Sequence, residues 1–396
     1  MRISARIGDY EIKKLHIGHG MATKDKQPKA AEKSTRTKKT PIIPPTEADF
    51  ESTQLDLFRS FLCNTDGERD QLSNTFDLWD SVPRYAVSRQ QMDKIRKEKG
   101  FLSLQRLAFQ YRQRPFEIRI QAARIYDEKT KTETDYYPSA NEELVEDALR
   151  KIAAEQRNAF FDKPNYRSGV VFSLYMLREE LRRRGHTRSY YEIVLSLNIL
   201  ASSIVEIRST DGKDGEGFTK SAYFSGLAAV SKHKLTEDPD AKWIVQFHPL
   251  VTQAMDTLTY RQFNYAQMMS HTSQLARWIH KQLSLKFTFA SLTTPFEMRY
   301  STIKRDSALL NNYARERKAV ESLDSAWNEL KTNGVLMKFE KNEVRGLRGK
   351  LEDVIYTLTP SLDFISAIKA ANKREKLAVD KKADSVGHLE DPKKKR

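Results

Sequence analysis

A regular pattern of apolar and polar residues runs through the chain between Leu275 and Leu358. Two sets of apolar residues there recur at helical spacing, and each predicts a helix with one buried face: Leu275, Trp278, Ile279 and Leu283, then Val320, Leu323, Trp327 and Leu330. Between them, Thr294-Pro295 predicts the start of another helix, because a capping hydroxyl precedes a proline suited to the first turn. The last helix is predicted from about Asn312 to Thr332, and Asn333-Gly334 ends it with a left-handed cap.

A basic hairpin is predicted after these helices. Val335, Met337 and Phe339 alternate with more polar neighbours, as in a half-buried strand. A loop from Lys341 to Lys350 bears glycine and arginine, including Arg345 and Arg348, and a second strand returns over residues 354–358. Three helices followed by such a hairpin form the winged-helix layout, in which the third helix enters a DNA major groove and the hairpin contacts backbone or minor groove.

The same order is predicted once before, between Phe116 and Phe247. A strand over residues 116–120 and a polar turn near Lys129–Thr134 lead into a return strand. Three helices follow, opened by Asn141, Ser173 and Thr187, and their inward apolar residues are Leu144, Val145, Ala148, Leu149 and Ile152, then Leu174, Leu177 and Leu181, then Tyr190, Ile193, Val194, Leu197 and Leu200. Strands are predicted over residues 204–207, 222–230 and 243–247, with a glycine-bearing tip at residues 211–217.

The two predicted winged helices differ in the charge of their third helices. In the second, Arg315, Arg317 and Lys318 begin the helix, Ser322 lies off its apolar face, and Lys304 and Arg305 precede it. In the first, the outer face is a mixed set with one acid: Arg188, Ser189, Glu192 and Ser196. The second is therefore predicted to be the DNA reader. The first is predicted to pair with another protomer or to hold phosphates through Arg182, Arg183 and Arg184.

These patterns divide the chain into five parts: an arm at 1–69, an irregular or helical lead-in at 70–115, the first winged helix at 116–247, the second at 248–372, and a charged tail at 373–396. The predicted fold class is α+β, predominantly helical, with two tandem winged helices. The arm is predicted to be disordered, because residues 24–40 hold almost no large apolar side chain. It could add phosphate contacts or act as a solubilising tail. The basic C-terminal tail is more typical of a solvated segment than of a nuclear signal.

The charge of the chain favours a polyanionic partner. Its 396 residues include 68 Lys and Arg against 53 Asp and Glu, a net charge of +15 at pH 7. No apolar run is long enough for a membrane span, and Lys24 to Lys39 lacks the bulky apolar residues of a membrane-surface helix, so nucleic acid is favoured over a membrane. Cys63 is the only cysteine, which excludes an intrachain disulfide framework and a cysteine-based zinc site and fits a reducing cytoplasm.

A short amphipathic peptide stands alone in the arm. Gln54-Leu55-Asp56-Leu57-Phe58 has polar, acidic surroundings and no apolar periodicity to join. Such anchors in a flexible segment indicate a docking peptide that orders in a partner's groove. The peptide resembles the bacterial clamp-binding motif, in which Gln54, Leu55, Leu57 and Phe58 would be the defining positions. The start of a domain helix that packs Leu57 inward is the alternative.

Taken together, these features resemble the plasmid replication initiators of the Rep/TrfA type, which bind iterons at a plasmid origin. The resemblance spans about Gln54 to Leu358, and the segments that carry it are Gln54-Leu-Asp-Leu-Phe58, Asn141-Glu-Glu-Leu-Val145, Ser189-Tyr-Tyr-Glu192, Leu258-Thr-Tyr-Arg261 and Asn328-Glu-Leu-Lys-Thr-Asn-Gly-Val-Leu336. Arg182 to Arg184 and the basic tail have no counterpart in that pattern.

This resemblance implies a non-enzymatic initiator of the bacterial cytoplasm, without cofactor or metal. It implies a homodimer off DNA, formed through the first winged helix, and a monomer that binds directly repeated sites in double-stranded DNA through both domains. It also implies opening of an adjacent AT-rich region and recruitment of the host DnaA, replicative helicase and sliding clamp. By position, Arg315, Arg317, Lys318 and Ser322 would contact base edges and phosphates.

Two other classes of protein are alternatives to an initiator. An enzyme is disfavoured, because Gly346-Leu-Arg-Gly-Lys350 lacks the spacing of a phosphate-binding loop, and a nickase would need two histidines flanking one apolar residue. His248 is more typical of a capping or core residue, and His271 and His280, nine residues apart, do not share a helical face. A transcriptional repressor or partition protein would carry the same winged helices, but it would have no evident use for the clamp-like peptide and would bind an inverted repeat as a stable dimer.

Overall fold

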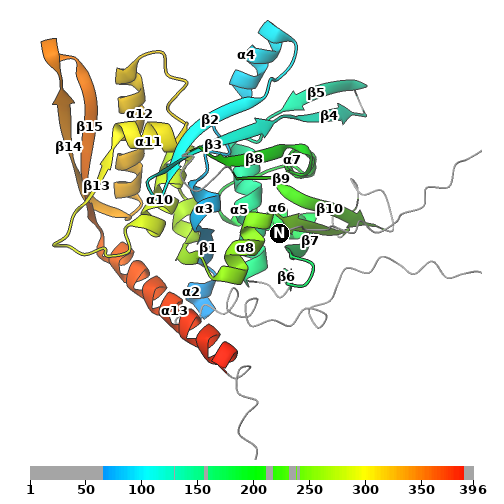
Figure 1. Ribbon diagram of the computed structural model, residues 1–396. Helices are drawn as coiled ribbons and strands as arrows, with labels where there is room; N and C mark the ends of the chain where they lie inside the picture. Colours follow the sequence, from blue (N-terminus) through cyan, green and yellow to red (C-terminus); the bar gives the residue numbers. More distant parts are fainter. Residues whose placement is uncertain are drawn as a thin grey trace, which may run out of the picture. The chain divides into compact units, whose positions relative to one another are not determined.

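The computed structural model describes residues 66–387, apart from 129, 156–158, 211–216, 232–237 and 239–240 (Figure 1). The fold is α+β, with 44% of residues in helices and 32% in strands. Strands therefore take a larger share than a predominantly helical fold would have. The arm up to residue 65, the peptide from Gln54 to Phe58, most of the predicted tip at 211–217 and the last nine residues lie outside the described residues.

The first half of the described chain holds the elements α2 (Asp66–Arg69), β1 (Leu72–Phe76), α3 (Asp77–Ser81), α4 (Arg89–Lys99), β2 (Gln105–Tyr111), β3 (Arg114–Gln121), β4 (Ala123–Asp127), β5 (Thr132–Tyr136), α5 (Ala140–Glu155), β6 (Ala159–Asp162), β7 (Arg167–Ser173), α6 (Leu174–Arg183), α7 (Tyr190–Ser202), β8 (Ile204–Ser209), β9 (Phe218–Ala222), β10 (Phe224–Val230) and β11 (Lys242–Phe247). Antiparallel pairing gives two four-stranded sheets, β2-β3-β8-β9 and β10-β11-β7-β6, and a separate β4–β5 hairpin. Helix α5 packs against α6, α7, β1 and β7.

The second half holds α8 (Pro249–Thr257), β12 (Tyr260–Asn264), α9 (Tyr265–Met269), α10 (Gln274–Lys286), β13 (Phe296–Arg299), α11 (Tyr300–Ser307), α12 (Glu316–Thr332), β14 (Leu336–Arg345), η2 (Leu347–Gly349), β15 (Leu351–Pro360) and α13 (Leu362–Gly387). Strands β13, β15 and β14 form one sheet in that order. Its core includes Trp327 of α12 against Tyr356 of β15, with ring centroids 5.5 Å apart.

Three predictions for the second half were wrong in detail. Thr294-Pro295 does not open a helix: the chain continues as β13, which pairs with β15, and α11 begins only at Tyr300. Met337 is 52% exposed and Leu336 is buried instead, because a β-bulge between Leu336 and Lys338 shifts the alternation by one residue. The predicted helix at 275–283 and the cap at Gly334, with φ +74°, are confirmed. The last helix ends at Thr332 as predicted, but it begins at Glu316 rather than near Asn312, because residues 312–315 form turns and bends.

The first half needed three corrections, two at helix starts and one on the outer face of α7. Ser139, rather than Asn141, lies at the start of α5, where its N–H and Oγ both donate to the Glu142 carboxylate. Ser189, rather than Thr187, caps α7 and forms a capping box with Glu192. Ser196 is buried and donates to Glu142 at 2.7 Å, so it does not lie on an outer face of α7. Ser173 caps α6 as predicted, by accepting from the N–H of Met176.

Residues 66–115 are integral to the fold. Strand β1 pairs with β12 of the second half, and β2 pairs with β3. Hydrogen bonds therefore cross the predicted boundaries at 115 and 247, and all described residues belong to one compact unit, Pro44–Arg396. Among the residues that the structure describes, no helix has both the length and the apolar character needed to cross a membrane.

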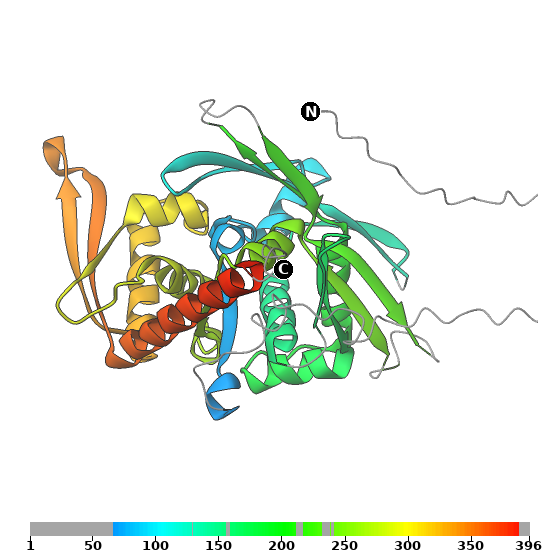
Figure 2. The ribbon, with the colours of Figure 1, turned by 60° about the horizontal axis from the view of Figure 1, so that its bottom comes forward.

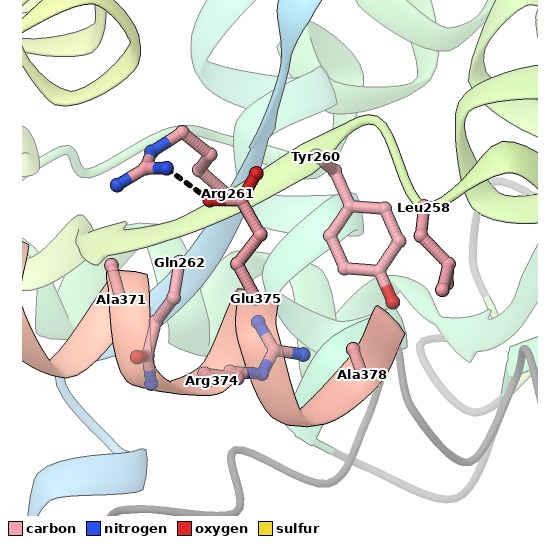
Figure 3. Close-up of a pocket in the computed structure, with 8 residues that line it drawn as sticks. All are labelled: Leu258, Tyr260, Arg261, Gln262, Ala371, Arg374, Glu375 and Ala378. Atoms are coloured by element: carbon pink, nitrogen blue, oxygen red, sulfur yellow. Dashed lines mark hydrogen bonds and ion pairs between the residues drawn. The ribbon is translucent and has the colours of Figure 1, made fainter. Parts of the chain in front are cut away.

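Helix α13 runs from the base of the β14–β15 hairpin across β12 (Figure 2). Arg374 donates from Nη1 to Asn74 of β1 at 2.7 Å, and Glu375 pairs with Arg261 of β12. Figure 3 shows these two α13 residues beside Tyr260 and Gln262 of β12. The helix extends through residue 373, where the charged tail was predicted to begin.

Helix α5 is buried on all sides, and its charged residues are paired inside the protein. Every residue from Glu142 to Ala154 is buried. The charge network centres on Asp80 of α3, whose carboxylate accepts hydrogen bonds from Thr75 Oγ1 at 2.8 Å and from the Phe76 N–H at 2.7 Å. Both oxygens of Asp80 also bind Arg150 of α5, and one binds Arg84. Burial alone would raise the pKa of Asp80, but Arg150, Lys281 and Arg84 hold it well below its usual range.

The same network joins the two halves of the chain. Lys281 of α10 pairs with Asp147 at 2.6 Å and with Glu143 at 3.1 Å, both on α5. The α10 side chain of Gln282 donates to the Asp80 carbonyl at 2.9 Å. Glu146 accepts from Trp79, Tyr85 and Arg84, and although burial opposes ionisation, Arg84 and Arg150 lower the pKa of Glu146 to about 2. Helix α10 is therefore fixed on α5 through charges that solvent does not reach.

Candidate nucleic-acid interface

Helix α12 exposes a polar and basic face opposite its apolar one. Ala319, Val320, Leu323, Ala326, Trp327 and Leu330 are buried. Residues 315–318 are all exposed, and Ser325, Asn328 and Lys331 continue the exposed face at the spacing of successive helical turns. We name Arg317, Lys318, Glu321, Ser325, Asn328 and Lys331 the α12 stripe. A helix with this face outward can lie in a DNA major groove.

The cations at the start of α12 are held weakly. Arg317, whose side chain is 90% exposed, and Lys318 both pair with Glu321, at 3.2 and 2.7 Å. Arg315 is the N-cap residue, makes no capping bond with its side chain, and has no ion-pair partner in the described part of the chain. Ser322 accepts a hydrogen bond from the Tyr313 hydroxyl at 2.8 Å. Exposed ion pairs of this kind contribute little stability, so a phosphate can replace Glu321 at small cost.

Lys304 and Arg305 lie on α11, beside the start of α12. Lys304 pairs with Glu316 in the first turn of α12, and Arg305 pairs with its neighbour Asp306 at 2.7 Å. Glu316 also accepts from the Tyr300 hydroxyl, and hydrogen bonds from Lys304 and Tyr300 lower its pKa. Lys304 is thus joined to the first turn of α12, and Lys304, Arg305 and Glu316 line one cleft.

The tip of the β14–β15 hairpin presents further cations beside an exposed leucine. Arg345 pairs with Glu343 and donates to the Gly349 carbonyl at 2.9 Å. The backbone of Arg348 lies in the turn η2, where Gly349 adopts a left-handed φ of +71°, and the Arg348 side chain lies outside the described part of the structure. Leu347 at the same tip is 92% exposed. Arg345 and Arg348 thus lie on one projecting hairpin, and the turn η2 fixes the backbone at its tip.

The predicted arginines of the first half are engaged elsewhere. Arg182 pairs with Glu179, and Arg183 pairs with Glu180 and with Asp70 at 3.0 Å. Arg184 is mostly buried on Glu180 and Asp70. Arg188 donates to Asn141 Oδ1 at 2.8 Å. These residues lie on α6 and just before α7, away from α12 in Figure 1, so the structure does not bring them into the α12 surface.

Some exposed cations near α12 were missed by the sequence analysis. Lys331 continues the α12 stripe, and its spacing from Lys318 and Asn328 was available in the sequence. Arg106 and Lys350 are exposed, and neither has an ion-pair partner among the residues described. Arg106 carries no sequence signal, because it belongs to a segment predicted as a lead-in, whereas it lies on the edge strand β2.

Helix α12 is anchored by side chains that leave its exposed stripe free. Glu329 near its C-terminal end accepts from Thr272 and from the Ser273 N–H, at the start of α10. Asp324 accepts from the Tyr356 hydroxyl at 2.6 Å and pairs with Lys341. The carbonyl of Asn333 accepts from Gln267 at 2.7 Å. The rotation of α12 about its axis is therefore fixed by contacts on its inner side.

Three of the described histidines are buried, and they form no metal cluster. His248 caps α8 by accepting from the Leu250 N–H and stacks on Trp79, which confirms its predicted capping or core role. His271 Nε2 and His280 Nδ1 lie 3.0 Å apart, because the loop before α10 folds His271 back onto the helix. Burial lowers the pKa of His248 to about 3 and of His271 to about 4. In the part of the chain described, no group of three His, Cys, Asp or Glu could hold a metal ion.

Stability is expected to fall as the pH drops below about 6.5. The unfolded chain protonates His248 and His271 near pH 6.5, whereas the folded chain protonates them only at about 3 and 4. Each contribution is therefore complete above pH 6.5 and is lost as the pH falls toward about 3 for His248 and about 4 for His271, at up to about 1.4 kcal/mol per pH unit for each histidine. Urea unfolding of the wild type and of His248→Asn, whose amide can still cap α8, should show a shallower pH dependence in the variant. Parallel curves between pH 7.5 and 5 would contradict this assignment.

The comparisons with known proteins show no sequence family for this chain. No protein-family model matches the chain, and no curated protein matches it. The solved structures that it is similar to include domains 2 and 3 of RctB as the selenomethionine derivative, at 10% identity, a TM-score of 0.43, and coverage of 72% of this chain and 96% of that one. A second structure of RctB domains 2–3 has 11% identity, a TM-score of 0.41, and coverage of 74% and 99%. The Pi initiator protein in complex with iteron DNA has 10% identity, a TM-score of 0.36, and coverage of 56% and 95%.

The third of these structures is that of an initiator protein bound to iteron DNA. A likeness with a TM-score below 0.5 assigns neither a shared architecture nor a function. The functional conclusion therefore rests on the residues exposed on α12 and on the β14–β15 hairpin.

Proposed function

We propose that this protein is a replication initiator that binds directly repeated sites in double-stranded DNA. The observation that carries the proposal is the exposed basic start of α12 beside a hairpin with a cationic tip. The order α10, β13, α11, α12, β14, β15 and the sheet order β13-β15-β14 are those expected of a winged helix. In that fold the third helix reads the major groove, which makes α12 the recognition helix.

The first half supports a second winged helix of less regular form. Strand β7 lies between α5 and α6, and it pairs with β11, which pairs with β10. The order β7-β11-β10 corresponds to the order β13-β15-β14 of the second half. The arginines of α6 lie in ion pairs with acidic neighbours, so this half suits pairing with another protomer better than reading bases. We propose that it provides the dimer contact off DNA, in the bacterial cytoplasm.

Base reading is assigned to the α12 surface, and backbone contact to its surroundings. Arginine can form two hydrogen bonds with guanine, and the exposed Arg315 and Arg317 would do so. Lys318, Lys304, Arg305, Arg345 and Arg348 would neutralise phosphates, which fix register without carrying sequence information. Ser322 would bind either a base edge or a phosphate. The net charge of +15 supplies the long-range attraction.

Selection from a random duplex pool tests the proposal. Bound fragments would be recovered, and the consensus footprinted on its source replicon. Direct repeats beside an AT-rich stretch are the expected result. A single inverted repeat over a promoter would favour a winged-helix repressor or partition protein, and absence of any enriched sequence would overturn specific DNA binding altogether.

Recruitment of host proteins forms the rest of the proposal, with no catalytic step by this chain. Double substitution of Leu57→Ala and Phe58→Ala is expected to abolish binding to the bacterial sliding clamp, because these residues would be the apolar anchors of the docking peptide. DNA affinity should stay unchanged, since the peptide lies in the arm. Clamp binding by surface plasmon resonance is the measurement, with Phe50→Ala and Leu62→Ala as the matched control pair. Equal binding by both double variants would remove the docking role.

Contacts with DnaA and the replicative helicase are proposed from the resemblance alone.

A further inference from the structure

A cleft of about 680 Å³ lies where the first half of the chain meets α11. It is lined by residues 106–108 of β2, by α11 and the chain that follows to Glu316, and by residues 350–352 at the start of β15. Its charged side chains are Arg106, Lys304, Arg305 and Lys350 against Glu316 and Glu352, an excess of two positive charges. We name it the β2–α11 cleft.

The unpaired backbone edge of β2 faces this cleft. Strand β2 is the outer strand of the sheet β2-β3-β8-β9. Gln110 lies opposite Pro115 of β3, which has no N–H, and the Gln110 N–H instead donates to Asp306 of α11 at 3.0 Å. In an antiparallel pair, alternate residues direct both backbone groups to the same side. The N–H groups of Ala108 and Arg106 therefore point to the same open edge, and no partner for them is found among the described residues.

The cleft thus combines two kinds of anion-binding group. Arg106 and Lys350 are exposed cations without an ion-pair partner in the described part of the chain, and they belong to different halves of it. The outward N–H groups of β2 add donors that carry no counter-charge. Lys304 and Arg305 lie between them, each held by one acidic neighbour. Such a set suits the tetrahedral oxygens of a phosphate, with guanidinium and amide donors converging from several sides.

We infer that the β2–α11 cleft holds the sugar-phosphate backbone of the same duplex whose major groove takes α12. The inference rests on the proposed function and extends the DNA surface to the first half of the chain. Continuity supports a duplex as the occupant: Glu316 lines the cleft and lies in the first turn of α12, while Lys350 lies next to the tip of the hairpin. Arg106 is accordingly a DNA-backbone contact, supplied by an element outside the winged helix.

The salt dependence of binding to the selected duplex tests this inference. Each neutralised phosphate contributes about 0.9 to the slope of log affinity against log salt. Arg106→Gln and Lys350→Gln are each expected to lower that slope by about 1, whereas Arg106→Lys should keep it. Lys97→Gln on α4 removes another exposed charge, one that does not line the cleft, and it should leave the slope unchanged. The ratio of specific to nonspecific affinity should stay the same in all variants, because backbone contacts carry no base information.

Phosphate ethylation interference locates the contact. At least one phosphate whose ethylation blocks the wild type should cease to matter in Arg106→Gln, and the same phosphate should still matter in Lys97→Gln. Thermal unfolding of each variant checks that the fold is retained. If the wild type binds its selected site and Arg106→Gln keeps both the slope and the interference pattern, the cleft is not a DNA contact and the proposed function stands. If the wild type selects no duplex, the proposed function itself fails.

Discussion

Replacing Asp80 with alanine is expected to lower the free energy of unfolding by about 3–5 kcal/mol, the largest stability effect of any single change considered for this protein. Asp80 is buried and receives hydrogen bonds from Thr75, Phe76, Arg84 and Arg150. Its removal leaves two buried guanidinium groups with fewer counter-charges and a buried hydroxyl and N–H without an acceptor. Urea unfolding at pH 7 measures the loss.

Asp93→Ala is the matched control for that change. Asp93 also pairs with an arginine, Arg96, but its side chain is 59% exposed on α4. An exposed pair contributes about 0–1 kcal/mol, so the control should remain near wild type. Asp80→Asn keeps an acceptor for Thr75 and Phe76 and should fall between the two. A loss below about 1 kcal/mol for Asp80→Ala would show that solvent reaches this network, contrary to its burial.

Replacing Arg315 with alanine is expected to weaken binding to the selected DNA site about 5- to 150-fold, equivalent to ~1–3 kcal/mol for one lost arginine–guanine contact. Arg315 makes no capping bond and no ion pair in the described chain, so its loss should barely change stability. Nonspecific binding should fall far less, because only one of many cations is removed. Fluorescence anisotropy with the selected duplex and with a scrambled duplex measures both affinities.

Lys97→Ala serves as the control for charge alone, since Lys97 is exposed on α4 and has no ion-pair partner in the described region. It should affect the two duplexes equally and slightly. Equal losses on the two duplexes for Arg315→Ala would mean that Arg315 contacts phosphate rather than a base edge.

Local signals predicted the second half of the chain well. The spacing of Leu323, Trp327 and Leu330 defined α12, and Asn333-Gly334 defined its end, because helix periodicity and a left-handed cap are written in neighbouring residues. Thr294-Pro295 misled, since a cap followed by proline also fits the approach to a strand. The chain forms a strand there rather than a helix because β13 pairs with β15. The paired residues are about sixty positions apart, so no local sequence pattern predicts this contact.

Buried charge was the feature least accessible from the sequence. The apolar residues of α5 predicted one inward face, yet Glu143 and Asp147 are buried as well. They are tolerated because Lys281, far along the chain, supplies the counter-charge. The same limit applies to Arg182, Arg183 and Arg184: a run of arginines is visible in the sequence, whereas the acidic partners that occupy them are not.

Only the part of the candidate site that lies on neighbouring residues could be predicted from the sequence. Arg315, Arg317 and Lys318 share one helix, so their grouping follows from spacing alone. Lys304 and Arg305 join them because α11 precedes α12 directly. Arg106 comes from a sheet edge two hundred residues away, and only the folded chain places it beside them.

The residues that anchor α12 are different from the residues that it exposes to solvent. Glu329, Asp324 and Asn333 fix the helix from its inner side, whereas the exposed stripe bears mainly its own pair partners. A library randomised at Arg317, Lys318, Ser325 and Asn328 would therefore vary DNA preference on an unchanged scaffold. Under the proposed function, two variants selected for different repeats would act as orthogonal initiators, and two replicons that carry them would be compatible within one cell.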